Sequence, residues 1–465
     1  MGNLAYSIIP GIYALIFCAI GIFGGGKLKE FKDFAVAGKK QSTFMTTMTL
    51  LATTIGASAT IGIADTTYNI GFPAFWWLCF GGIGLILQAL LISEKVRSMD
   101  ADTLPDLAAK LVGGAAEKTI SFIIVISWIG VIAGQLVAMS SFVTFITGKE
   151  GRLVFIIVTI LALLYTVAGG QMSVVKTDMV QFLVIAVGFV VILVYLYLVK
   201  GDASGEVFKN IELINENYGR HSLVTQFFVI GGVYFLGPDI ISRNFISKDQ
   251  KTAKKASLIG GAALIVFAIV IVMTGMWARF NIPAAEKGDM KTLLYVIKFV
   301  PLPVGLLLSL GLLSAMLSSL DTCLVNASII FVKDILKKEN VLLVRITILV
   351  IGVMAMTFAL MGNGDIISLL SAAYSVYTPG VIFPLLVAII VYGKKDIRRP
   401  IWLAAVITGG SFGIIGSLPS GFTDFLPGFL VSNLNIFGMA VSLILALLSI
   451  TDKNHQAVVS PEEAP

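Results

Sequence analysis

Thirteen apolar segments, most of them about twenty residues long, make up most of this 465-residue chain. A helix of about 20 apolar residues is long enough to cross the hydrocarbon layer of a membrane. The segments are residues 4–24, 42–63, 70–93, 119–147, 152–168, 175–199, 223–241, 256–279, 301–331, 341–362, 365–392, 399–417 and 429–450. We therefore expect an all-α polytopic membrane protein with about 13 transmembrane helices.

The composition excludes several other classes of protein. Hydrophobic residues make up 57% of the chain and charged residues only 13%, against roughly 25% charged residues in soluble domains. A soluble protein this apolar could not cover its own surface, which excludes a soluble enzyme and a disordered chain. The three cysteines, Cys18, Cys79 and Cys323, all lie within apolar segments, which argues against a disulfide scaffold.

The Lys and Arg residues predict the orientation of the chain. If the N-terminus lies outside, the inside loops hold 24 of the 33 basic residues and the outside loops hold nine. Basic residues gather on the cytoplasmic side of membrane proteins, so the distribution favours N-terminus outside and C-terminus inside. It also accounts for the net charge of +6 without a nucleic-acid partner.

The second segment is interrupted by polar and small residues. Residues 46–62 contain many Ser and Thr hydroxyls together with Gly56 and Gly62. One interpretation is a tightly packed helix whose hydroxyls bond back to its own carbonyls. The other is a helix broken near Gly56, with free carbonyls that line a cavity. Composition does not separate the two.

The ninth segment carries a polar face. Helical spacing places Ala315, Ser318, Ser319 and Thr322 together, with Asp321 on an adjoining edge. A hard cation such as Na⁺ binds several oxygen ligands, so this face suits an ion. The alternative is a polar contact between helices. An aspartate at membrane depth beside several hydroxyls favours the ion site.

A third polar stretch, residues 165–181, joins the fifth and sixth segments through a Gly-Gly turn. Asp178 lies just inside the sixth segment, where a carboxylate stabilises a helix N-terminus by ~0.3–1 kcal/mol. The alternative role is a carboxylate on an ion path. Position favours the first role, and a contact with Asp321 or Thr322 would favour the second.

The seventh segment contains Gly237 and Pro238, which predict a second broken or kinked helix. It lies five segments after the second segment, which is the first interrupted one. Two interrupted helices at matching positions indicate an inverted-repeat transporter. We expect repeats at 42–199 and 223–392, an extra N-terminal span at 4–24, two C-terminal spans at 399–450 and a cytoplasmic tail at 451–465.

Taken together, these stretches resemble the sodium:solute symporter family, which includes sodium/galactose, sodium/proline, sodium/pantothenate and sodium/sialic acid transporters. The similarity rests on LLATTIGASATIG in the second segment, YTVAGGQMSVVKTDMVQ, SRNFISKDQKTAKKA after the seventh segment and SAMLSSLDT in the ninth. It implies a LeuT-like inverted repeat of 5+5 helices.

The resemblance also implies ion sites. The principal Na⁺ site would use the carbonyls of Ala52, Ile55 and Ala315 and the hydroxyls of Ser318 and Ser319. A second Na⁺ site would use Asp178 with Ser318, Asp321 and Thr322. Asp321 stands where the family pattern has a hydroxyl residue. Its role is open between strengthening that site, binding a proton and forming a structural hydrogen bond.

The predicted substrate cavity lies between the two broken helices and is neutral. Thr54 stands where the sodium/proline pattern carries an aspartate, and the fourth segment lacks the arginine of the sialic acid transporters. The expected contacts are hydroxyl, amide and aromatic residues, although each aromatic residue has packing as its alternative role. They are Thr53, Thr54, Ser58, Thr60, Trp76, Trp77, Gln88, Gln135, Tyr234, Phe235, Tyr374, Tyr377 and Thr378.

The sequence thus predicts a secondary active transporter of the inner cell membrane. It would couple inward Na⁺ movement to uptake of a small polar or zwitterionic solute by alternating access. The alternative is a proton-coupled or uniporting carrier of the same fold that uses Asp321 or Asp178. An enzyme is disfavoured because the two histidines, His221 and His455, lie in a loop and the tail. The expected partners are the solute, Na⁺ and the lipid bilayer, and the oligomeric state stays open.

Overall fold

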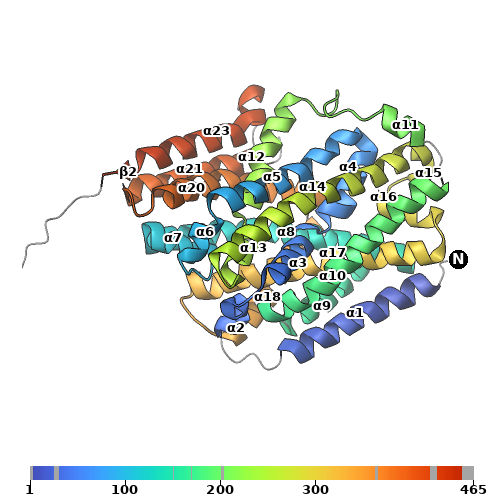
Figure 1. Cartoon of the computed structure of the whole chain (residues 1–465), viewed down its shortest axis with the longest axis horizontal. Helices are drawn as coiled ribbons and strands as arrows, with labels where there is room; N and C mark the ends of the chain where they lie inside the picture. The colour runs from blue at the N-terminus through green and yellow to red at the C-terminus, as the bar shows by residue number, and fades with distance from the viewer. Residues whose placement is uncertain are drawn as a thin grey trace, which may run out of the picture.

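Long helices that run roughly side by side form almost the whole molecule (Figure 1). The computed structural model describes residues 4–25, 31–149, 151–168, 170–200, 204–361, 365–418 and 427–452. The long helices are α1 (Leu4–Gly25), α5 (Phe75–Leu91), α8 (Gly114–Thr147), α9 (Arg152–Ala168), α10 (Gln171–Val194), α14 (Gln250–Asn281), α17 (Leu302–Ile329), α18 (Val341–Met361), α21 (Arg399–Gly416) and α23 (Gly428–Leu448).

Other spans are assembled from consecutive pieces. The second predicted segment forms α3 (Thr43–Thr54), the π-helical turn η2 (Ser58–Gly62) and α4 (Ile63–Ile70). The seventh forms α12 (Arg220–Leu236) and α13 (Pro238–Ile246). The eleventh forms α19 (Ile366–Tyr377), η7 (Thr378–Ile382) and α20 (Phe383–Val391). η3 (Phe72–Ala74), η4 (Tyr195–Lys200) and η6 (Ile330–Ile335) extend α5, α10 and α17.

The remaining elements are short and connect the spans. They are α2 (Phe31–Val36), η1 (Ala37–Lys39), α6 (Ser93–Ser98), α7 (Leu104–Val112), α11 (Ser204–Lys209), α15 (Ala284–Lys287), α16 (Thr292–Val296), η5 (Ile297–Phe299) and the two-residue antiparallel strands β1 (Asp396–Ile397) and β2 (Ile450–Thr451).

Each of the thirteen predicted segments coincides with apolar helix. Within the described residues, nine helices are long and apolar enough to cross a membrane, and one bent pair, Thr43–Thr54 with Ser58–Ile70, passes the same test. Three shorter apolar helices, Leu4–Phe17, Arg152–Val167 and Asn433–Leu448, fall on the other three segments. That all thirteen cross a bilayer stays a prediction.

Glycines allow three of the central helices to approach at backbone distance. A Cβ atom on Gly84 of α5 would lie 2.4 Å from the Gly231 carbonyl oxygen of α12. On the next face of α5, a Cβ atom on Gly82 would lie 2.7 Å from the Gly261 carbonyl oxygen of α14. Helices in membranes associate through such close packing, because lipid supplies no hydrophobic driving force between them. These contacts fix the position of the second broken helix.

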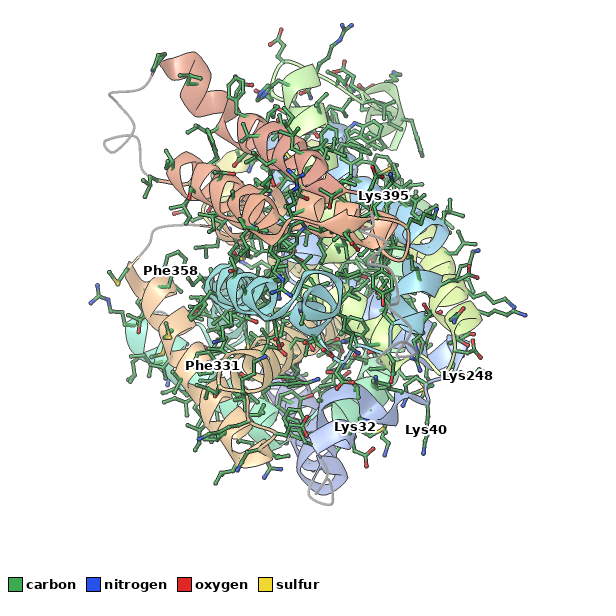
Figure 2. The ribbon with its side chains drawn as sticks, turned by 90° about the vertical axis from the view of Figure 1, so that its left-hand side faces the viewer. Lys32, Lys40, Lys248, Phe331, Phe358 and Lys395 are labelled. Carbon is green, nitrogen blue, oxygen red and sulfur yellow. The ribbon has the colours of Figure 1, made fainter. Side chains whose placement is uncertain are left out.

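The start of α1 and the strand β2 lie at opposite ends of the bundle. In Figure 1 the N-terminus lies at the right and β2 at the left, while α1 and the α21–α23 pair lie on opposite sides of the remaining helices. Figure 2 shows the left-hand end, which carries Lys32, Lys40, Lys248 and Lys395. All four belong to the loops predicted to lie inside. The fold therefore gathers these lysines at one end, and which side of a membrane that end faces stays a prediction.

An ion-pair cluster ties the loops together at this same end. Asp102, between α6 and α7, lies 2.8 Å from the Lys39 ammonium of η1 and 2.5 Å from the Lys333 ammonium of η6. Burial raises the pKa of the Asp102 carboxyl, but the ammonium groups of Lys333 and Lys39 outweigh it and hold that pKa below its usual range. The cluster joins three elements that are distant in sequence.

Candidate functional site

The first helix break lies where the sequence predicts it. α3 ends at Thr54, η2 begins at Ser58, and the two halves are bent by 59°. Gly56, between them, faces α17 closely, since a Cβ atom on it would lie 2.3 Å from the Ser319 hydroxyl oxygen. The 59° bend confirms the interpretation of a helix broken near Gly56.

The break frees carbonyl oxygens at the end of α3, because a helix leaves its last four carbonyls without intrahelical partners. The Thr53 carbonyl accepts the Ser319 hydroxyl hydrogen at 2.8 Å, and the Thr54 carbonyl accepts from Tyr234 at 3.3 Å. Among the described residues, no hydrogen bond reaches the carbonyls of Ala52 and Ile55. These are the two carbonyls that the family resemblance assigns to Na⁺.

α17 presents its hydroxyl face to this break. Ser318 donates its hydroxyl hydrogen to Asp178 Oδ1 at 2.6 Å, and Ser319 donates to the Thr53 carbonyl. Each hydroxyl has thereby used its hydrogen, which leaves the oxygen lone pairs for a cation. Ala315 precedes the two serines by one turn and is fully buried. Neutral carbonyl and hydroxyl oxygens of this kind suit a hard cation.

An internal cation lies beside the carboxylate of the second predicted Na⁺ site. Asp178 of α10 and Arg243 of α13 are both buried, and the guanidinium Nη2 lies 3.3 Å from Asp178 Oδ2. The same Nη2 donates to the hydroxyls of Thr53 at 2.5 Å and Thr322 at 2.9 Å. Asp178 also accepts from Thr49. Arg243 thus contacts two of the residues proposed to bind a second ion.

Asp321 bonds to a residue outside this pair. Its Oδ1 accepts the hydroxyl hydrogen of Thr166 on α9, and the side chain is buried. The described structure contains no ion pair between Asp321 and a basic residue. Of the four predicted second-site residues, Asp178 and Thr322 accept from Arg243 and Ser318 donates to Asp178, whereas Asp321 bonds to Thr166 on another helix.

The second helix break carries a carboxylate. α12 ends at Leu236, Gly237 has an extended backbone, and α13 begins at Pro238, which confirms the second interruption. Asp239 follows in the first turn of α13 and is 9% exposed. Its Oδ2 accepts from Cys323 Sγ at 3.8 Å, whereas its Oδ1 has no hydrogen-bond partner among the described residues.

A small cavity lies between the two breaks. Its volume of about 20 Å³ admits about one water molecule, so an organic solute requires the helices to move apart. Six of the predicted contacts line it: Thr53, Thr54, Ser58, Gln135, Tyr234 and Tyr374. The Gln135 amide oxygen also accepts from the Ala57 amide at 3.0 Å, which holds α8 against the break.

The other seven predicted contacts lie outside this lining and have partners of their own. Gln88 bonds to the Phe235 carbonyl at 2.8 Å and to Ser257 at 2.7 Å. Tyr377 and Thr378 donate to carbonyls of α12, and Thr60 donates to the Gly56 carbonyl. Trp76 donates to the Leu213 carbonyl, while Trp77 packs against Tyr374.

A much larger cavity, of about 980 Å³, lies elsewhere and shares no residue with the central one. It is lined by the C-terminal part of α8, by Tyr6 of α1 and by α16 with its neighbouring loops, including Lys287, Lys291 and Lys298. It contains none of the predicted site residues. The central cavity, though small, is therefore the one that the two breaks and α17 define.

The sequence analysis does not assign Asp239 or Arg243 to a site, and its prediction of a neutral cavity is wrong because Asp239 lines it. Both were visible as charged residues beside a Gly-Pro break in an apolar segment, and ionisable residues at membrane depth indicate function. Arg243 follows Asp239 by four residues, which is one helical turn. What the sequence does not show is that Arg243 pairs with Asp178, 65 residues earlier in the chain.

Comparison with known proteins agrees with this geometry. Residues 34–395 match the model of the sodium:solute symporter family. The osmoregulated proline transporter OpuE of Bacillus subtilis is 25% identical over 474 residues, which covers 93% of this chain and 94% of the relative. The high-affinity proline transporter PutP of the same organism is 24% identical over 471 residues, which covers 93% and 97%.

Solved structures show the same fold. A Na⁺-coupled sialic acid symporter in a substrate-bound, outward-open state matches with a TM-score of 0.75 at 16% identity, covering 97% of this chain and all of the other. MhsT in complex with L-phenylalanine matches with a TM-score of 0.55 at 14% identity, covering 88% and 98%. The LeuT-like fold is thereby confirmed. The chain belongs to the sodium:solute symporter family and is a membrane transporter, not an enzyme, that couples Na⁺ to the transport of small solutes.

Proposed function

We propose that this protein takes up a small polar or zwitterionic solute together with Na⁺. The ion binds to the carbonyls of Ala52, Ile55 and Ala315 and to the hydroxyls of Ser318 and Ser319. The observation that carries the proposal is the contact between Ser319 and the Thr53 carbonyl, which brings α17 against the break in α3. Na⁺ at this place would hold α3 and α17 together.

The solute binds in the central cavity between the two breaks. Hydroxyl and amide groups of Thr54, Ser58 and Gln135 offer hydrogen bonds there, and Tyr234 and Tyr374 offer aromatic faces. The proline transporters among the relatives support an amino acid of this size as the solute. The closed cavity opens to one side of the membrane at a time, with the N-terminus outside and the C-terminus inside.

One Na⁺ moves in each cycle, because Arg243 takes the place of a second. Two unit positive charges 4 Å apart repel by about 4 kcal/mol at an effective dielectric constant of 20. An ion beside Asp178 would face the Arg243 guanidinium at about this distance, since the guanidinium already bonds Asp178 and Thr322. The proposed second Na⁺ site of Asp178, Asp321 and Thr322 therefore stays without an ion in our proposal.

A single ion is sufficient to drive accumulation. One Na⁺ that enters down 100 mV releases ~2.3 kcal/mol. A tenfold Na⁺ gradient adds ~1.4 kcal/mol. Together these support a several-hundredfold solute gradient.

Uptake by proteoliposomes tests the proposal. Purified protein in vesicles receives a radiolabelled amino-acid mixture that includes L-proline, with an inward gradient of Na⁺, of K⁺ or of protons. We expect accumulation above equilibrium only with Na⁺. Accumulation driven by protons without Na⁺ would instead support the carrier in which Asp321 or Asp178 binds a proton. Absence of accumulation under every gradient would contradict an amino acid as the solute.

A further inference from the structure

Asp239 is the one charged group that lines the central cavity. The lining consists of Thr53, Thr54, Gly56, Ser58, Val131, Gln135, Val233, Tyr234, Asp239, Ile240, Ser319, Cys323, Leu370 and Tyr374. No Lys or Arg belongs to this set. The cavity therefore has a negative charge on one wall, on the side of the second helix break.

The free oxygen of this carboxylate is not explained by the protein around it. Asp239 is nine-tenths buried, yet Oδ1 has no hydrogen-bond partner among the described residues. Leaving a buried acceptor unbonded costs ~1–3 kcal/mol, and more when the group is charged. A position in the first turn of α13 explains why a carboxylate is favoured there, because the helix dipole stabilises it. It does not explain why one oxygen is left unbonded beside a cavity.

The neighbouring arginine does not pair with it. Arg243 lies one turn further along α13, but its Nη2 is directed to Asp178, Thr53 and Thr322 and its Nη1 donates to Ser242. Its only ion pair among the described residues is with Asp178. Arg243 stabilises the charged form of Asp239 through space but gives it no hydrogen bond, so Oδ1 is available to a donor inside the cavity.

Other residues of the lining complement a solute that carries both an ammonium group and an acceptor group. Tyr234 and Tyr374 line the cavity together with Asp239, and aromatic faces attract cations by ~0.5–2 kcal/mol. The Ser58 side chain at the first break also lines the cavity. A protonated amine at Asp239 and an acceptor group at the Ser58 hydroxyl would use the groups of both breaks.

We propose that the transported solute carries a protonated amino group, which donates to Asp239 Oδ1, so that the substrate class is α-amino acids and related amines. This inference rests on the proposed function, because it places the solute in the same cavity. It adds to that proposal the residue that recognises the amino group of the solute. Neutral polyols and simple carboxylates are excluded as substrates.

Matched solute pairs test this inference on the purified full chain. Thermal stabilisation is measured with three amino acids: L-proline, L-alanine and L-phenylalanine. Their partners, in which oxygen replaces the amine, are tetrahydrofuran-2-carboxylate, L-lactate and phenyllactate. Pyrrolidine serves as a free amine and glucose as a neutral polyol. Each is measured in Na⁺ and in K⁺. We expect stabilisation by the solutes with an ammonium group and none by their oxygen partners or by glucose at the same concentration. Stabilisation by an oxygen partner or by glucose would overturn the inference. A lack of stabilisation by every amine would overturn it as well.

The carboxylate itself is tested by substitution. Asp239→Asn should weaken amine binding at least tenfold, whereas Asp239→Glu, which keeps the charge, should retain the preference for amines. Asp334→Asn removes another buried carboxylate, which accepts from Thr103 outside the cavity, and controls for the loss of a buried charge. Unchanged amine affinity in Asp239→Asn would overturn the inference. Amine binding that is equal in Na⁺ and K⁺ would leave it standing and contradict the Na⁺ site of the proposed function.

Discussion

The two broken helices differ in the charge that they bring to the centre of the protein. The break in α3 offers carbonyl and hydroxyl oxygens and no ionisable side chain between Thr53 and Gly62. The break between α12 and α13 is followed by Asp239 and Arg243, both buried. Neutral oxygens suit an ion that must bind and leave again, whereas a fixed charge suits a permanent partner or a charged solute. The neutral break is the one that we propose for Na⁺, and the charged break is the one that we propose for the amino group of the solute.

The largest expected effect comes from Arg243. Arg243→Met leaves the buried Asp178 carboxylate without its counter-charge, and removing one member of a buried pair costs about 3–5 kcal/mol. We expect a clear drop in the melting temperature of the purified protein. The double variant Asp178→Asn with Arg243→Met removes both charges and should recover at least half of that loss. If Arg243→Met alone were as stable as the wild type, the ion pair of Arg243 with Asp178 would not contribute to stability.

A smaller effect is expected at Gly56. Gly56→Ala places a methyl group against Ser319 and forces α17 away from the first break, an overpacking cost of about 1–3 kcal/mol. Na⁺ should then stabilise the protein less in a thermal-shift titration. Gly231→Ala on α12 is the matched control, since its nearest contact is an ordinary 3.4 Å to the Phe80 carbonyl oxygen. Equal Na⁺ responses in the two variants would contradict a site at the first break.

The smallest effect concerns the charges at the lysine-rich end, outside both breaks. The pKa of Asp102 is held below its usual range, so its ion pairs contribute stability above the unfolded pKa of about 4 and lose it as the pH falls through the lower folded pKa. Asp102→Asn should lower stability at pH 7 by ~1 kcal/mol or less. The variant should also lose part of the wild-type decline in melting temperature below about pH 4. A variant with the wild-type profile would exclude this cluster as a source of acid sensitivity.

The sequence predicts the spans and both breaks because those depend on local composition. Apolar length identifies the helices, and Gly56 and the Gly237-Pro238 pair mark the interruptions. The pairing of Arg243 with Asp178 depends on how α10 and α13 pack, which no local pattern contains. Packing also decides the partners of Gln88. An amide in an apolar span predicts a solute contact, whereas in the structure its oxygen accepts from Ser257 and its nitrogen donates to the Phe235 carbonyl.

The central claim is that Na⁺ binds where α17 meets the first break, and direct binding of radioactive ²²Na⁺ to purified protein tests it without knowledge of the solute. We predict saturable binding of one Na⁺ per chain. The double variant Ser318→Ala with Ser319→Ala should bind about 100-fold more weakly, which corresponds to about 2.8 kcal/mol. Ser309→Ala removes a buried hydroxyl of the same helix that donates to the Gly305 carbonyl, and this variant should bind as the wild type does. Undiminished binding in the double variant would contradict the account.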